Sequence, residues 1–170
     1  MLPAPWGVIG RCRTGLAANG GDGQFGAVYF NMTAGNRFSR VMTMIARSLR
    51  LTNKLAFKKM RIGIDFGGVI VKPAEGGSPF DLGAGLELMV PGAFEGVTKL
   101  VQLSEGNVWV VSKASVATQT ATRRWLGKTG FFQATGFKQG NIQFCAKRHE
   151  KAEICDRLQL TFFVDDSEEV

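Results

Sequence analysis

The sequence predicts an α/β domain built on a Rossmann-like parallel sheet with helices on both faces. Two observations lead to this fold class. From residue 60 onward, short apolar segments of strand length alternate with longer segments whose apolar residues recur at helical spacing. Three of the short segments also end in an acidic or hydroxyl residue. Strands that alternate with helices are typical of parallel sheets, and ligands bind at the carboxyl ends of such strands.

Four strands and three helices are expected between residues 60 and 170. The strands are the apolar runs 61–65, 107–111, 141–146 and 160–164. The first helix opens at Pro91-Gly92, and the others span 116–126 and 148–158. The first and third helices each have one apolar face, made of Phe94, Val97, Leu100 and Val101 in the first and of Ile154, Cys155 and Leu158 in the third. Residues 71–90 are rich in glycine and proline and are expected to form a loop.

Residues 1–59 form a separate basic leader, expected to be disordered or partly helical. They hold nine of the 21 basic residues but a single acid, Asp22, so residues 60–170 are close to neutral. The basic charge therefore does not indicate nucleic-acid binding by the domain. An organelle transit peptide, sequence upstream of a true start at Met60 and a functional basic tail are all open readings. The expected location is the cytoplasm, with organelle import as the alternative.

Composition also excludes several classes of protein. The three cysteines, Cys12, Cys145 and Cys155, show no CxxC spacing, so neither a zinc site nor a disulfide framework is expected. No apolar run approaches the ~20 residues that a membrane-spanning helix needs. The single histidine, His149, has no nearby cysteine or acid cluster and is read as a solvated residue at a helix start.

Acidic and hydroxyl residues follow three of the expected strands. These residues are Asp65, Ser112 and the pair Asp165-Asp166. Because the carboxyl ends of parallel strands meet at one edge, they should converge in space. A carboxylate there can attack a phosphoryl group, with Mg²⁺ held by the acids to neutralise charge. Ser112 and Lys151 are placed to hold the transferred phosphate by hydrogen bonding and charge.

The order of these features resembles the haloacid dehalogenase-like superfamily over residues 60–170. The first motif of that family, an apolar strand followed by Asp-x-Asp-Gly, is matched here by residues 64–71, Ile-Asp-Phe-Gly-Gly-Val-Ile-Val. The second is a strand ending in Ser or Thr, here residues 108–112. The third is a lysine before a helix, here Lys151, with Lys147 as the alternative. The fourth is an apolar strand ending in paired acids, here residues 162–166.

The resemblance implies a role for each matching residue. Asp65 would be the nucleophile and a Mg²⁺ ligand, and Gly67 would offer its backbone carbonyl to the metal. Ser112 and Lys151 would bind phosphate, and Asp165 and Asp166 would complete the metal site. The implied activity is Mg²⁺-dependent hydrolysis of a small phosphorylated substrate, either an ester or an anhydride, through an aspartyl-phosphate.

The departure from the family lies at Gly67, where its phosphatases carry a second aspartate that donates and accepts protons. Glycine transfers no proton, and acid–base catalysis typically contributes ~10²–10⁴-fold. Weak hydrolysis is therefore the first expectation. A catalytically inactive binding or regulatory domain is the alternative, and different chemistry is a third reading. A fragment of an actin-like sugar kinase is a remote alternative, which is kept because Gly67-Gly68 also fits the phosphate loop of that family.

Two further expectations follow from the length of the segments. The loop 71–90 stands where the family inserts a cap, and its roughly 20 residues suffice for a minimal cap only. The family normally continues with a further strand and helix beyond the paired acids, so the domain is expected to lack its final strand and helix. A partner protein that supplies a cap or this C-terminal part is therefore an open possibility.

Overall fold

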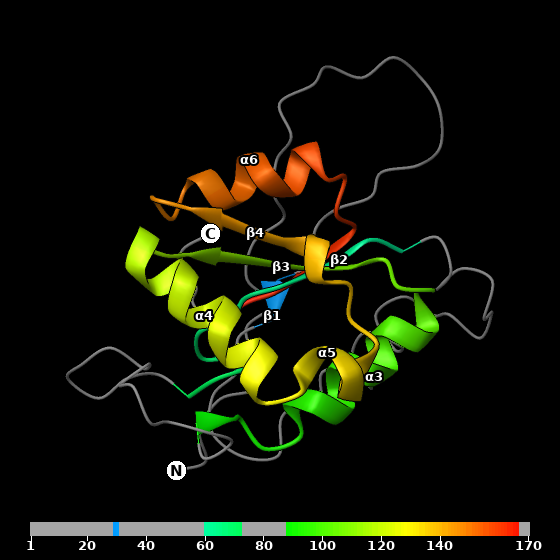
Figure 1. Ribbon diagram of the computed structural model, residues 1–170. Helices are drawn as coiled ribbons and strands as arrows, with labels where there is room; N and C mark the ends of the chain where they lie inside the picture. Colours follow the sequence, from blue (N-terminus) through cyan, green and yellow to red (C-terminus); the bar gives the residue numbers. More distant parts are fainter. Residues whose placement is uncertain (1–28, 31–59, 73–87, 167–170) are drawn as a thin grey trace, which may run out of the picture.

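The computed structural model of the 170-residue chain describes residues 29–30, 60–72 and 88–166. These residues form one parallel sheet with helices on both faces (Figure 1). The strands are β1 (Tyr29–Phe30), β2 (Ile62–Ile64), β3 (Val108–Lys113), β4 (Ile142–Cys145) and β5 (Phe162–Val164). Their order is β1-β5-β2-β3-β4, and every neighbouring pair is parallel. The predicted α/β class is confirmed.

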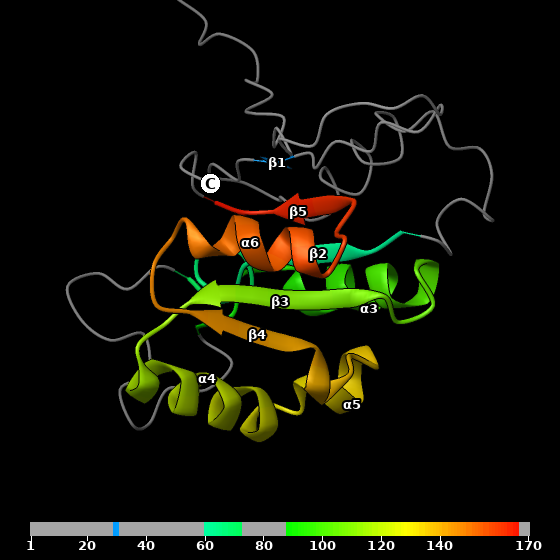
Figure 2. The same cartoon turned by 90° about the horizontal axis from the view of Figure 1, so that it is seen from above.

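Helices cover the two faces unequally. The helices are α3 (Ala93–Leu103), α4 (Val116–Lys128), α5 (Phe131–Thr135) and α6 (Glu150–Arg157), with a short 3₁₀ helix, η2, at Gln139–Asn141. Three of them, α3, α4 and α5, lie on one side of the sheet, and α6 lies on the other (Figure 1). Figure 2 shows the same layers from above. None of the described helices is long and apolar enough to cross a membrane.

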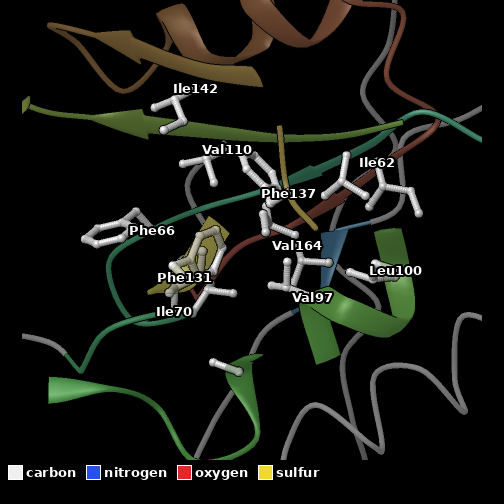
Figure 3. Close-up of a cluster of buried hydrophobic side chains, with 14 of the residues drawn as sticks. Ile62, Phe66, Ile70, Val97, Leu100, Val110, Phe131, Phe137, Ile142 and Val164 are labelled. Carbon is white, nitrogen blue, oxygen red and sulfur yellow. The ribbon is translucent and has the colours of Figure 1, made fainter. Parts of the chain in front are cut away.

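The alternation of side chains along the strands divides the core in two. Ile62 and Ile64 of β2 belong to the larger cluster. Figure 3 shows Ile62 in this cluster together with Val97 of α3 and Phe131 of α5. Phe163 of β5 faces the smaller cluster, which it shares with Ile154 of α6. Gly63 lies on this second side, and a Cβ there would overlap the Phe163 ring and come within 2.6 Å of Leu160. Because the strand is buried on both faces, only a glycine fits at this position.

The structure corrects several element boundaries. Ser112 lies inside β3, which continues to Lys113, whereas the strand was expected to stop at residue 111. The second helix extends to Lys128, two residues beyond its predicted end, and α5 and η2 were not predicted. Gly130 and Gly136, with φ of 70° and 71°, bound α5 in the left-handed conformation that favours glycine.

Two residues of the leader also join the sheet. Tyr29 and Phe30 pair in parallel with Phe163 and Val164, so β5 is not the edge strand that a domain without its final strand would have. The sequence did not predict a strand at these two residues of the leader. The rest of the leader, residues 73–87 of the loop 71–90 that was expected to form a minimal cap, and residues 167–170 lie outside the described residues.

Candidate active site

The two central strands deliver acids to one point. Ile64 is in register with Val164, so Asp65 and Asp165, the next residues, leave adjacent strands side by side. The Asp65 amide donates to the Val164 carbonyl at 2.8 Å and extends the pairing by one residue. Parallel strands thus bring together two carboxylates that are 100 residues apart in the sequence, as predicted from the strand ends.

A buried lysine joins these two carboxylates. Lys151 Nζ lies 2.8 Å from Asp65 Oδ2 and 2.7 Å from Asp165 Oδ2. Lys151 is only 2% exposed, and Asp165 only 1%. Lys147, the alternative third-motif lysine, is exposed. The structure therefore selects Lys151 as the lysine of the site.

Glu150 fixes the start of α6 and with it the position of Lys151. Its Oε2 accepts hydrogen bonds from the amides of Ala146 and Lys147, at 2.9 and 3.1 Å. These bonds lower the pKa of Glu150, since they favour its ionised form. The carboxylate thus ties the loop after β4 to the first turn of α6.

The turn after Asp65 is held by backbone hydrogen bonds. The Phe66 amide donates to Asp65 Oδ1 at 2.7 Å, and the Phe66 carbonyl accepts from the amides of Ile70 and Val71. The Phe66 ring packs edge-on against Trp125 of α4, with 5.7 Å between ring centroids. The nucleophile candidate therefore stands on a turn anchored in the larger core.

The two glycines of this turn differ in surroundings. Gly68 has φ of 72°, and a Cβ at this position would overlap the carboxylate of Asp166. This close approach places Asp166 against the turn. A Cβ at Gly67 would meet nothing within 4 Å in the described structure. Gly68 is therefore required by geometry, whereas Gly67 has room for a side chain.

Ser112 completes the group of polar residues. It is buried at the end of β3, and its hydrogen bond to Asp65 lowers the pKa of that carboxyl. Burial and the Asp165 charge raise the pKa of Asp65, while Lys151 lowers it, and the net direction is upward. Burial alone would lower the pKa of Lys151, but the charges of Asp65 and Asp165 raise it by more. The net shift is upward, so the ammonium stays charged.

The charge of the site fits a divalent cation. Oxygen atoms of Asp65, Asp165 and Asp166 lie within 4.8 Å of one another. Burial and repulsion from the other two acids raise the pKa of Asp166 to about 6. Three carboxylates against one ammonium carry two surplus negative charges when ionised. Hard carboxylate oxygens are the ligands that Mg²⁺ prefers, so the residues fit this ion.

Comparison with known proteins gives no relative. No family model, curated protein or solved structure matches the chain. The resemblance to haloacid dehalogenase-like enzymes therefore rests on the sequence motifs.

Most of the residues predicted for the site come together. Asp65, Ser112, Lys151, Asp165 and Asp166 converge at the carboxyl edge of the sheet, with Gly67 in the adjoining turn. Sequence reasoning missed Gly68 and Glu150. Gly68 was hidden in a glycine pair that reads as an ordinary turn. Glu150 was visible only as the residue before Lys151, and its role depends on a loop closure that no spacing predicts.

Proposed function

We propose that this chain is a Mg²⁺-dependent phosphohydrolase of the haloacid dehalogenase-like type, acting through an aspartyl-phosphate on a phosphate ester or anhydride. The observation that carries the proposal is the buried Lys151 ammonium between Asp65 and Asp165, with Asp166 beside them. A third carboxylate beside a buried ion pair adds negative charge that a bound cation would neutralise. Carboxyl groups with raised pKa values at the carboxyl ends of parallel strands favour a functional site there.

In this proposal Asp65 is the nucleophile. One of its carboxylate oxygens forms a bond to phosphorus, the bond to the leaving oxygen breaks, and the electron pair departs with that oxygen. Lys151 and Ser112 bind the phosphoryl oxygens by charge and hydrogen bonding. Asp65, Asp165 and Asp166 would hold Mg²⁺, which supplies charge neutralisation and allows one anion to attack another. Water then cleaves the aspartyl-phosphate and restores the Asp65 carboxylate.

Phosphate release from an activated aryl phosphate, with Mg²⁺ present, tests this function. We expect native activity to be abolished by Asp65→Asn. Asp156→Asn is the matched control, because Asp156 is an exposed aspartate of α6. Activity that survives Asp65→Asn would contradict the proposed nucleophile.

An inactive binding or regulatory domain is the second candidate, and Gly67 favours it. Gly67→Asp distinguishes the two, since the position has room for a Cβ. If the native chain is inactive and Gly67→Asp gains activity, the site is intact but has lost its proton donor. In the actin-like sugar kinases the strand before the phosphate loop is followed by an antiparallel strand. Here both neighbours of β2 run parallel to it, so this alternative receives no support.

A further inference from the structure

Within residues 60–72 and 88–166, each acid close to Asp65 already has another role than donating a proton to a leaving group. Asp65 and Asp165 both bind the Lys151 ammonium. Asp166 faces Gly68 and belongs to the proposed metal ligands. Gly67 has no side chain, and no described atom fills the place of its Cβ within 4 Å. Without general acid catalysis, the leaving group has to depart as a stable anion.

Basic residues line the same edge of the sheet on the side of β3 and β4. Lys113 ends β3, one residue after Ser112, and is in register with Cys145. Lys147 follows in the loop between β4 and α6, and both lysines are exposed. Burial raises the pKa of the Cys145 thiol, and so do the charges of Glu150 and Asp65, while Lys151 and Lys113 lower it. Lys113 therefore lies in the electrostatic neighbourhood of the site.

One acid, Glu150, follows the loop between β4 and α6 as the first residue of that helix. Glu150 directs Oε2 to two backbone amides of that loop. Arg148 and His149 are further exposed basic residues in the same loop. An anion that leaves Asp65 in this direction therefore meets positive charge.

We propose that the substrate of this site is a phosphoanhydride, whose leaving group is a phosphate or polyphosphate anion held by Lys113 and Lys147. This inference rests on the proposed function and specifies its substrate class. The lack of an uncommitted acid in the part of the site that the structure describes and the basic edge are separate observations, and both favour the same leaving group. An alkyl phosphate ester satisfies neither, because its alkoxide needs a proton and carries no further negative charge.

The chemistry balances without a general acid for the first step. An Asp65 oxygen forms a bond to the terminal phosphorus, and the bond from that phosphorus to the bridging oxygen breaks. The electron pair stays on the bridging oxygen, which leaves as part of the phosphate anion. The oxygen of a water molecule then forms a bond to the same phosphorus. The bond between this phosphorus and the Asp65 oxygen breaks, and its electron pair stays on the Asp65 carboxylate. The protons of the water pass to the released phosphate and to solvent.

The test compares kcat/KM for pyrophosphate, p-nitrophenyl phosphate and glycerol 3-phosphate, with Mg²⁺ present. We expect pyrophosphate to exceed glycerol 3-phosphate by about 10²-fold or more, the usual contribution of a general acid. Gly67→Asp should narrow this ratio. Changing Lys113 and Lys147 together to alanine should lower kcat/KM for pyrophosphate roughly 5-fold, and less for p-nitrophenyl phosphate. Lys128→Ala, at the far end of α4, is the matched control.

Binding of methylenediphosphonate, measured by calorimetry, gives a readout independent of turnover. The double lysine variant should bind it more weakly, and Lys128→Ala should bind it as the native chain does. Equal turnover of glycerol 3-phosphate and pyrophosphate would overturn the anhydride assignment. The proposed function would still stand if Asp65→Asn abolishes p-nitrophenyl phosphate hydrolysis. Diphosphonate binding that needs the lysines, without any Asp65-dependent turnover, would remove the function and keep the ligand class. Absence of both lysine-dependent diphosphonate binding and Asp65-dependent turnover would overturn the substrate class and the proposed function together.

Discussion

Lys151 shows how a single residue ties folding to chemistry in this domain. Its ammonium is nearly inaccessible to water and has two carboxylate partners within hydrogen-bonding distance. Removing one partner from such a buried group typically costs ~3–5 kcal/mol, because an uncompensated charge remains. The same ammonium is the group that would bind phosphate. Its position is therefore set by the fold before any substrate arrives.

The two glycines of the turn predict opposite responses to a methyl group. Gly68→Ala should destabilise the domain by about 1–3 kcal/mol, because φ of 72° is unfavourable for alanine and its Cβ overlaps Asp166. Gly67→Ala is the matched control and should change stability little, since its Cβ has open space. Urea denaturation of both variants measures the difference. Equal losses would show that the close approach of Asp166 to Gly68 is not maintained in solution.

At this scale the sequence predicted the residues whose position follows from strand ends. Asp65 and Asp165 were predictable because each directly follows an apolar run, and parallel strands align their ends. The contact of Lys151 with both acids was less accessible. It depends on the angle of α6 and on the loop held by Glu150, and periodicity records neither.

The elements that matter most for the site are α6 and the loop before it. The helix covers the second face of the sheet through Ile154 and Cys155, and its first turn presents Lys151. No side chain at the N-cap residue His149 makes a capping hydrogen bond. Glu150, the first residue of the helix, instead binds two amides of the preceding loop and so holds that loop against the start of α6. The register of α6 therefore depends on an ionised carboxylate.

The ionisation of Glu150 predicts a pH-dependent contribution to stability. Its folded-state pKa is below the ordinary value of 4.5, so the stabilisation is present above that value and is lost as the pH falls through the folded pKa. Glu150→Gln should lower the melting temperature at pH 7 and reduce the loss on acidification. Glu153→Gln, an exposed residue of the same helix, is the control. A pH profile of the melting temperature that is the same for native and Glu150→Gln would contradict this role.

Helices and strands were predicted correctly where the periodicity of apolar side chains is strong. Elements of only a few residues were missed. The helical spacing of Val97 and Leu100 predicted α3, and the apolar runs predicted β2 to β5. The five-residue α5 was missed because Gly130 and Gly136 read as loop residues, although they bound a helical turn. A two-residue strand such as β1 carries no period at all, so its pairing with β5 was invisible in the sequence.

The whole domain combines two cores of unequal size with an electrostatically strained edge. The larger core lies beneath three helices and includes Trp125 and Phe131, while the smaller is closed by α6. Two strands of the sheet end in acids at one edge, where Lys151 pairs with Asp65 and Asp165, and Asp166 adds a third carboxylate. Burying like charges destabilises the folded chain, and functional sites commonly retain such a cost. The stability of the molecule should therefore depend on whether a cation is bound.

This dependence gives a prediction for the complete protein. Asp166→Asn removes one of the two surplus charges while keeping the shape of the side chain, so the metal-free protein should melt about 2–5 °C higher at pH 7. The native protein should be stabilised by Mg²⁺ in proportion to its saturation, by about 2.7 kcal/mol at a hundredfold excess over Kd. In Asp166→Asn this response should largely disappear.

Asp156→Asn controls for the loss of one surface carboxylate. The measurement is the melting temperature of each variant, with EDTA and across a Mg²⁺ titration. A native protein indifferent to Mg²⁺, together with an Asp166→Asn variant no more stable than native, would mean that the acids are balanced without a metal. The proposed metal site would then be wrong.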